Sequence, residues 1–175
     1  MRLYLVNYRH ESSAPAQSIT RLPLTEATKL AEQLYRNSTC KAHRRFGTNF
    51  FQYYENRKKA EQWMYQQFQQ LGGHPKTANP LYFSLQSSSV LADNYDDGKE
   101  IRLNLDAIAD VDISFTLGDS MALYYTESLN RLLTKRELLA LLGSYDHDMG
   151  ALIQASGEHC AFIEAQLWND RYIAE

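Results

Sequence analysis

The stretch QYYENRKKAEQWMYQQFQQLGGHPKTANPLYFSLQ, residues 52–86, decides the fold class because a helix pattern is followed directly by a strand pattern. Apolar side chains recur at helical spacing over about 52–71, which predicts an amphipathic helix. The core-facing stripe of this helix is expected to be Ala60, Met64, Phe68 and Leu71. Gly72-Gly73 supplies a left-handed cap after the helix, and Pro75 prevents its continuation.

Alternation of apolar residues predicts the strands. We expect them over residues 2–8, over 81–86 with Leu81, Phe83 and Leu85 inward, and over 100–105 with Ile101, Leu103 and Leu105 inward. The β-rich runs 112–117 and 121–125 flank a glycine-containing turn, which predicts a hairpin. Residues 159–168 alternate as in a strand, although their composition also permits a helix; we predict a strand.

Capping residues locate the shorter helices. Thr25 is the expected N-cap of a helix over 26–36, and a serine is the expected cap of a short helix within 87–94. Thr134 and Glu137 form a capping box before a leucine-rich helix. Asp146 is the expected cap of a helix that extends to Ser156. Mixed strands and helices without regular βαβ alternation predict one α+β domain over 1–175, with helices packed on a mixed or mainly antiparallel sheet.

The composition is that of an ordinary globular domain. Of 175 residues, 44% are hydrophobic and 22% are charged, and no apolar run is long enough to span a bilayer. The apolar start is interrupted too early for a signal peptide. A domain of this size needs no disulfide, so we expect Cys40 and Cys160 to be reduced and the protein to be soluble and cytoplasmic.

The basic residues are concentrated in one aromatic-rich segment, 41–59. Its candidate anion-binding side chains are Lys41, Arg44, Arg45, Arg57 and Lys58. Cations beside aromatic rings are typical of surfaces that bind single-stranded nucleic acid, yet the sequence pI of about 6.0 argues against that partner. The second half of the chain is acidic, and we expect the acids of 93–112 to neutralise much of this segment.

The remaining motifs do not form a complete catalytic or metal site. Gly118-Asp119-Ser120 resembles the serine block of lipases and esterases, but the chain lacks their Asp-x-x-His, so we interpret it as a turn. Cys40 and His43 have chelating spacing, but the adjacent pair His159-Cys160 rarely binds one ion. The chain contains no phosphate-binding loop and no Rossmann glycine pattern, and we expect no cofactor and no metal.

Taken together, these features favour a binding or protein-interaction module, with another protein or a second copy of the chain as possible partner and no membrane association. An enzyme whose site is assembled from distant residues is the alternative. Single-stranded nucleic-acid binding through residues 41–59 is the second alternative.

Overall fold

The computed structural model describes residues 2–11, 13–96, 98–158 and 160–173. Within these residues six strands form one sheet in the order β3-β1-β2-β6-β4-β5, and each neighbouring pair is antiparallel. The strands are β1 (Tyr4–Arg9), β2 (Leu81–Leu85), β3 (Lys99–Asn104), β4 (Ile113–Thr116), β5 (Leu133–Thr134) and β6 (Glu164–Leu167). The prediction of an α+β fold with a mainly antiparallel sheet is confirmed.

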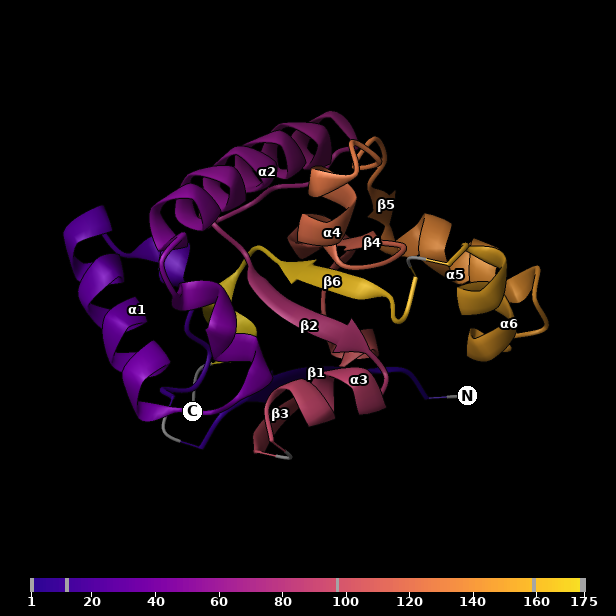
Figure 1. Ribbon diagram of the computed structural model, residues 1–175. Helices are drawn as coiled ribbons and strands as arrows, with labels where there is room; N and C mark the ends of the chain where they lie inside the picture. Colours follow the sequence, from indigo (N-terminus) through magenta and orange to yellow (C-terminus); the bar gives the residue numbers. More distant parts are fainter. Residues whose placement is uncertain (1, 12, 97, 159, 174–175) are drawn as a thin grey trace.

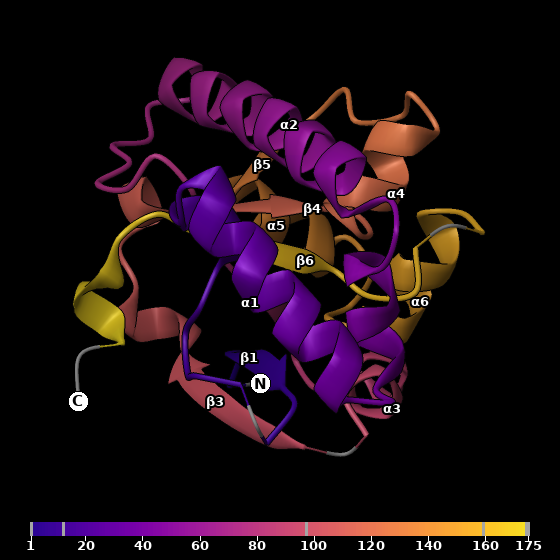
Figure 2. The same cartoon turned by 60° about the vertical axis from the view of Figure 1, so that its left-hand side comes forward.

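The helices cover both faces of this sheet. They are α1 (Leu24–Asn37), α2 (Phe50–Gln70), α3 (Ser89–Asn94), α4 (Ser120–Tyr125), α5 (Lys135–Gly143) and α6 (Met149–Ala155). Short 3₁₀ helices are η1 (Ile19–Arg21), η2 (Lys41–Phe46), η3 (Leu105–Ala107), η4 (Asp110–Asp112) and η5 (Asp170–Tyr172). Figures 1 and 2 show α1 and α2 on one side of the sheet and α5 and α6 on the other. Among the described helices, none combines the length and apolar character that crossing a membrane requires.

Helix α2 confirms most of the predicted stripe. Met64 and Phe68 are fully buried, as is Ala60. Gly72 adopts a φ of 87°, and the N–H of Gly73 donates to the Phe68 carbonyl (2.8 Å), which closes the helix as predicted. Leu71, however, is 41% exposed. The prediction that it lies in the core is wrong because it occupies the C-cap position, where the chain already turns away.

The other helices differ from expectation mainly at their starts. Helix α1 begins before Thr25 and has no side-chain cap. The predicted hairpin is wrong: its second run forms α4, because the Asp119 carboxylate accepts hydrogen bonds from the N–H groups of Met121 and Ala122 (2.8 and 3.0 Å). Helix α6 is capped by Asp148, not by Asp146, whose φ of 53° places it in the preceding turn.

Two further sequence predictions concern the C-terminal part of the chain. The capping box of α5 is present, with the Thr134 side chain and Glu137 bonded reciprocally. The strand predicted over 159–168 is confirmed for Glu164–Leu167, which form β6, whereas His159 lies outside the described residues. All of β6 is buried, because the neighbouring strands β2 and β4 and the helices on both faces enclose it.

The two faces of the sheet differ in chemistry. The face toward α5 and α6 is an apolar core to which the strands contribute side chains such as Leu81, Phe83, Phe115, Ala165 and Leu167. Leu138, Leu142 and Leu152 of α5 and α6 complete it. The opposite face lies beneath α1, η2 and α2, and it carries the candidate site.

Candidate functional site

The sheet face beneath α2 is lined by polar side chains that are nevertheless buried. Those of β4 and β6 are Ser114, Thr116, Glu164 and Gln166, all 5% exposed or less. Alternate residues of a strand share a face, so they lie on the side of Trp168, whose ring stacks on Phe68 of α2. Burying polar groups is unfavourable unless they are hydrogen-bonded, so their partners decide what this face can do.

A chain of hydrogen bonds crosses this face from Trp168 to Glu164. Trp168 Nε1 donates to Ser114 Oγ (2.9 Å), and the Ser114 hydroxyl donates to Gln166 Oε1 (2.9 Å). Gln166 Nε2 then donates to Thr116 Oγ1 (3.1 Å) and to Glu164 Oε1 (3.0 Å). Because the amide oxygen of Gln166 is already an acceptor, its nitrogen must be the group that faces Glu164.

A buried ion pair lies on the α2 side. Arg57 Nε is 3.2 Å from Glu61 Oε1, and Glu61 is fully buried. The same carboxylate accepts hydrogen bonds from the Tyr82 hydroxyl (2.9 Å) and from Asn79 Nδ2 (2.6 Å). The guanidinium of Arg57 lies over the Tyr82 ring, 3.7 Å from its centroid. Burial, partly offset by Arg57, raises the pKa of Tyr82. The charge of Arg57 is therefore already compensated within the protein.

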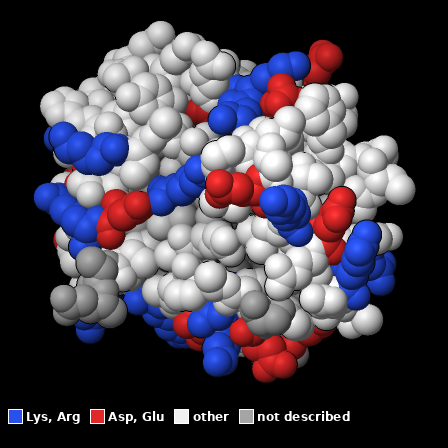
Figure 3. Space-filling view, turned by 90° about the vertical axis from the view of Figure 1, so that its left-hand side faces the viewer, with Lys and Arg blue, Asp and Glu red and all other residues white. Residues whose placement is uncertain are grey.

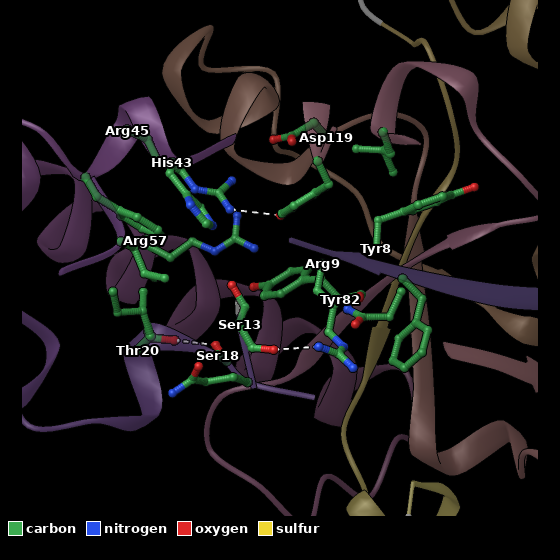
Figure 4. A pocket seen from close by; sticks show the side chains of 18 of the residues that line it. Tyr8, Arg9, Ser13, Ser18, Thr20, His43, Arg45, Arg57, Tyr82 and Asp119 are labelled. Atoms are coloured by element: carbon green, nitrogen blue, oxygen red, sulfur yellow. Dashed lines mark hydrogen bonds between the residues drawn. The ribbon is translucent and has the colours of Figure 1, made fainter. Parts of the chain in front are cut away.

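A cavity of about 180 Å³ lies between this polar face and the layer formed by α1, η2 and α2 (Figure 4). It is larger than the roughly 150 Å³ engineered cavity that holds one benzene molecule in another protein. Arg9, His43, Arg45, Arg57 and Glu164 all contribute to its wall. These residues come from β1, η2, α2 and β6, so the fold brings them together from distant parts of the chain.

Two nitrogens of the cavity wall are buried without a hydrogen-bond partner, Arg9 Nε and His43 Nδ1. Arg9 Nη1 donates to the backbone carbonyl of Ser13 (2.5 Å), which orients the guanidinium. Burial, together with the nearby charges of Arg45 and His10, lowers the pKa of His43 to about 4, so its ring is neutral at pH 7. An unsatisfied buried donor costs about 1–3 kcal/mol, which is a reason to expect an acceptor in this cavity.

The Glu164 carboxyl gives the cavity a group that can change charge near neutral pH. Burial and the negative charge of Asp119 raise its pKa to about 7, against the opposing effect of Arg57. Oε1 accepts from Gln166 and, at 3.4 Å, from the backbone N–H of Ser120. Within the described part of the chain, no cation lies within ion-pair distance of Glu164.

The five predicted anion-binding residues do not converge. Arg45 and Arg57 line the cavity, where Arg45 donates to the Tyr95 hydroxyl (3.0 Å). Lys41 is exposed and pairs with Asp93 (2.5 Å). Arg44 is exposed. Lys58 is exposed as well and lies over the Tyr54 ring, 5.6 Å from its centroid. The sequence segment therefore supplies two cavity residues and three outer cations.

The expected neutralisation by residues 93–112 occurs only in part. Asp93 meets Lys41, whereas Arg57 is neutralised by Glu61 from its own helix. Figure 3 shows Lys and Arg side chains interleaved with Asp and Glu on the face that includes α1. Such a mixture lacks the single-sign stripe that a long polyanion requires.

The motifs set aside in the sequence have structural roles. Asp119 caps α4, and the Ser120 hydroxyl is fully buried and without a partner. Both cysteines are free and buried, and Cys40 Sγ donates to the Asn94 carbonyl (3.0 Å). Across the described ranges, no three His, Cys, Asp or Glu side chains are grouped as metal ligands.

Sequence reasoning missed Arg9, Asp119 and Glu164 as site residues. Arg9 ends a strand, and nothing local distinguishes it. For Glu164 a signal existed: a carboxylate and an amide, Glu164 and Gln166, occupy one face of a strand whose other residues are apolar. In a strand buried on both faces, such a pair indicates a polar site.

No protein-family model matches this chain, and neither the curated proteins nor the solved structures yield a significant match.

Proposed function

We propose that this protein binds a small organic anion in the cavity between the α1–η2–α2 layer and the sheet. The observation that carries the proposal is the buried, unpartnered Nε of Arg9 in the cavity wall. A carboxylate, sulfonate or phosphate oxygen would satisfy this donor with a charge-assisted hydrogen bond, the strongest kind available to a side chain. His43 Nδ1 offers a second contact.

The charges of the wall support an anion over a cation. Arg9, Arg45 and Arg57 line the cavity together with the acidic side chains Asp119 and Glu164. Arg57 is paired with Glu61, and the raised pKa of Glu164 makes it partly neutral at pH 7. Arg9 and Arg45 have no carboxylate within ion-pair distance among the described residues. They therefore supply the positive potential that attracts an anion.

The test is calorimetric titration with sulfate, phosphate, benzoate, benzenesulfonate and ribose 5-phosphate. We expect at least one of these probes to bind, and Arg9→Gln to weaken it about tenfold or more, because a hydrogen bond to a charged group contributes about 1.5–3 kcal/mol. Arg44→Gln is the matched control, since it removes the same charge outside the cavity. Binding that both variants weaken equally, or no binding of any probe, would contradict the proposal.

We also propose a cytoplasmic location. The two free, buried thiols support it, because a reducing compartment preserves them. Thiol counting on freshly purified, denatured protein tests this point. Two reactive thiols are expected, and a count of zero would contradict the proposed location.

A further inference from the structure

Only one of the two oxygens of the Glu164 carboxyl accepts hydrogen bonds from the described residues. Oε1 accepts from Gln166 Nε2 (3.0 Å) and from the backbone N–H of Ser120 (3.4 Å). The Ser114 hydroxyl fixes the Gln166 amide, so this nitrogen cannot become an acceptor. Within the described residues Oε2 takes part in no hydrogen bond or ion pair. A proton on this carboxyl therefore belongs on Oε2, on a side chain that lines the cavity.

The cavity wall contains the tyrosines Tyr8, Tyr53 and Tyr95, and further charged and titratable groups from several elements lie in it or against it. These further groups are Arg57 and Glu61 of α2, Asp119 before α4, Tyr82 of β2, Arg9 of β1, and His43 and Arg45 of η2, with His10 against His43. Arg57 forms its ion pair with Glu61 and lies over the Tyr82 ring, so it offsets the negative charge of Glu164 only in part. Asp119 adds negative charge on the other side.

We propose that Glu164 is protonated when the cavity is occupied and donates a hydrogen bond from Oε2 to the bound anion, so that binding takes up a proton. The ligand class that this arrangement favours is an anionic group with an acceptor oxygen for the Glu164 carboxyl, in a cavity that Arg9 also lines. The inference rests on the proposed function, since it names how the same cavity holds its anion.

The physical reason is that two negative charges cannot share a small buried space at acceptable cost. Burial and the nearby Asp119 already raise the pKa of Glu164 to about 7. An anion placed against Oε2 adds repulsion to the ionised form and an acceptor for the protonated form, and both effects raise this pKa further. By linkage, affinity is highest at low pH and falls as pH rises through the pKa of the unliganded protein.

The experiment is titration with benzenesulfonate, whose own charge is constant across the pH range used. We expect wild-type affinity to fall about thirtyfold between about pH 6 and about pH 8.5, because one proton is lost above a pKa of about 7. Repeating the titration at about pH 8 in buffers of different ionisation heat should show uptake of close to one proton. This measurement of proton uptake uses only the wild-type protein, so it does not depend on the folding of a variant.

Glu164→Gln gives the sharper test. Because Gln166 requires an oxygen at the Oε1 position, the new amide places its NH₂ at the Oε2 position and mimics the protonated acid. The variant should bind equally well at both pH values and take up no proton. Glu127→Gln, the same change at an exposed site after α4, should retain the wild-type pH dependence.

The outcomes separate the two proposals. If the affinity of the wild type for benzenesulfonate does not change with pH, the proton linkage is wrong, but the anion site is not contradicted. A pH dependence that survives in Glu164→Gln would assign the proton to another group and would also overturn the proton linkage. If benzenesulfonate and the other probes bind at neither pH, the anion site itself is wrong.

Discussion

The two faces of the sheet are formed by the same strands, but one face buries apolar side chains and the other buries hydrogen-bonded polar side chains. Phe115 points into the apolar core beside α5 and α6, whereas its neighbour Ser114 belongs to the hydrogen-bonded chain beneath α2. The apolar face is stabilised by burial of surface, which depends little on pH. The polar face contains an ion pair, a buried carboxyl with a raised pKa and unpartnered nitrogens, so its contribution to stability changes with pH.

The two faces also differ in how easily hydrophobic residues could replace their side chains. Well-packed apolar residues can often replace a buried polar network without loss of stability. The cost of burying Glu164, Gln166 and Arg57 is a reason why we place the proposed ligand site on this face. The following variants test whether the two faces differ as described.

The largest effect is expected on the apolar face. Phe115→Ala should lower the free energy of unfolding by about 3–5 kcal/mol, because it leaves a cavity in a closed core. Chemical denaturation at about pH 6 and about pH 8 should give the same loss at both values. A loss that changes with pH would mean that the apolar core is coupled to the polar face.

The next effect concerns the ion pair on the polar face. Glu61→Leu should cost about 3–5 kcal/mol, because it leaves Arg57 buried without its partner. The double variant with Arg57→Met should recover most of that loss, since it removes the stranded charge. Denaturation of the wild type, both single variants and the double variant gives a double-mutant cycle. If the losses in the free energy of unfolding are additive, Arg57 and Glu61 are not coupled.

A change of opposite sign is expected at Glu164. Its pKa is raised from 4.5 to about 7 in the folded protein, so the folded state binds the proton more tightly than the unfolded state does. Stability from this group is complete below about pH 4.5 and is lost as pH rises through about 7. Glu164→Gln should therefore stabilise the protein above pH 7, by at most about 3 kcal/mol, and have little effect near pH 4.5.

Denaturation of the wild type and Glu164→Gln across this pH range measures the difference directly. The lowered pKa of His43 affects both proteins equally, so it cancels in the comparison. A constant difference between them at all pH values would show that Glu164 is not the titrating group.

The sequence predicted the apolar face better than the polar one, for a physical reason. Periodic apolar residues mark the core directly, so Leu81, Phe83 and Leu85 of β2 were assigned correctly. The α4 segment was mistaken for a strand, because one carboxylate cap outweighs the β propensity of the residues that follow.

The site was predictable only in part. Arg45 and Arg57 were identified because they lie in a conspicuous cluster of cations and aromatic residues. Arg9 and Glu164 were not, since the pairing of β1 with β2 and of β2 with β6 brings their strands to the same cavity. Contacts of this kind join residues far apart in sequence, and no local pattern records them.

The smallest effect is expected within the hydrogen-bonded chain. Ser114→Ala removes the acceptor of Trp168 Nε1 and the donor to Gln166, and it should cost about 1–3 kcal/mol because two buried groups are left unsatisfied. Ser84→Ala is the matched control, since the Ser84 hydroxyl donates its single proton to backbone carbonyls, that of Gln86 (2.8 Å) and more distantly that of Val6 (3.4 Å), and accepts from no side chain of the described residues. Ser114→Ala should also alter tryptophan fluorescence, because Trp168 is fully buried. Equal losses from the two serines would mean that the chain from Trp168 to Glu164 does not act as a unit. The polar face would then be a set of separate hydrogen bonds, unlike the cooperative core opposite.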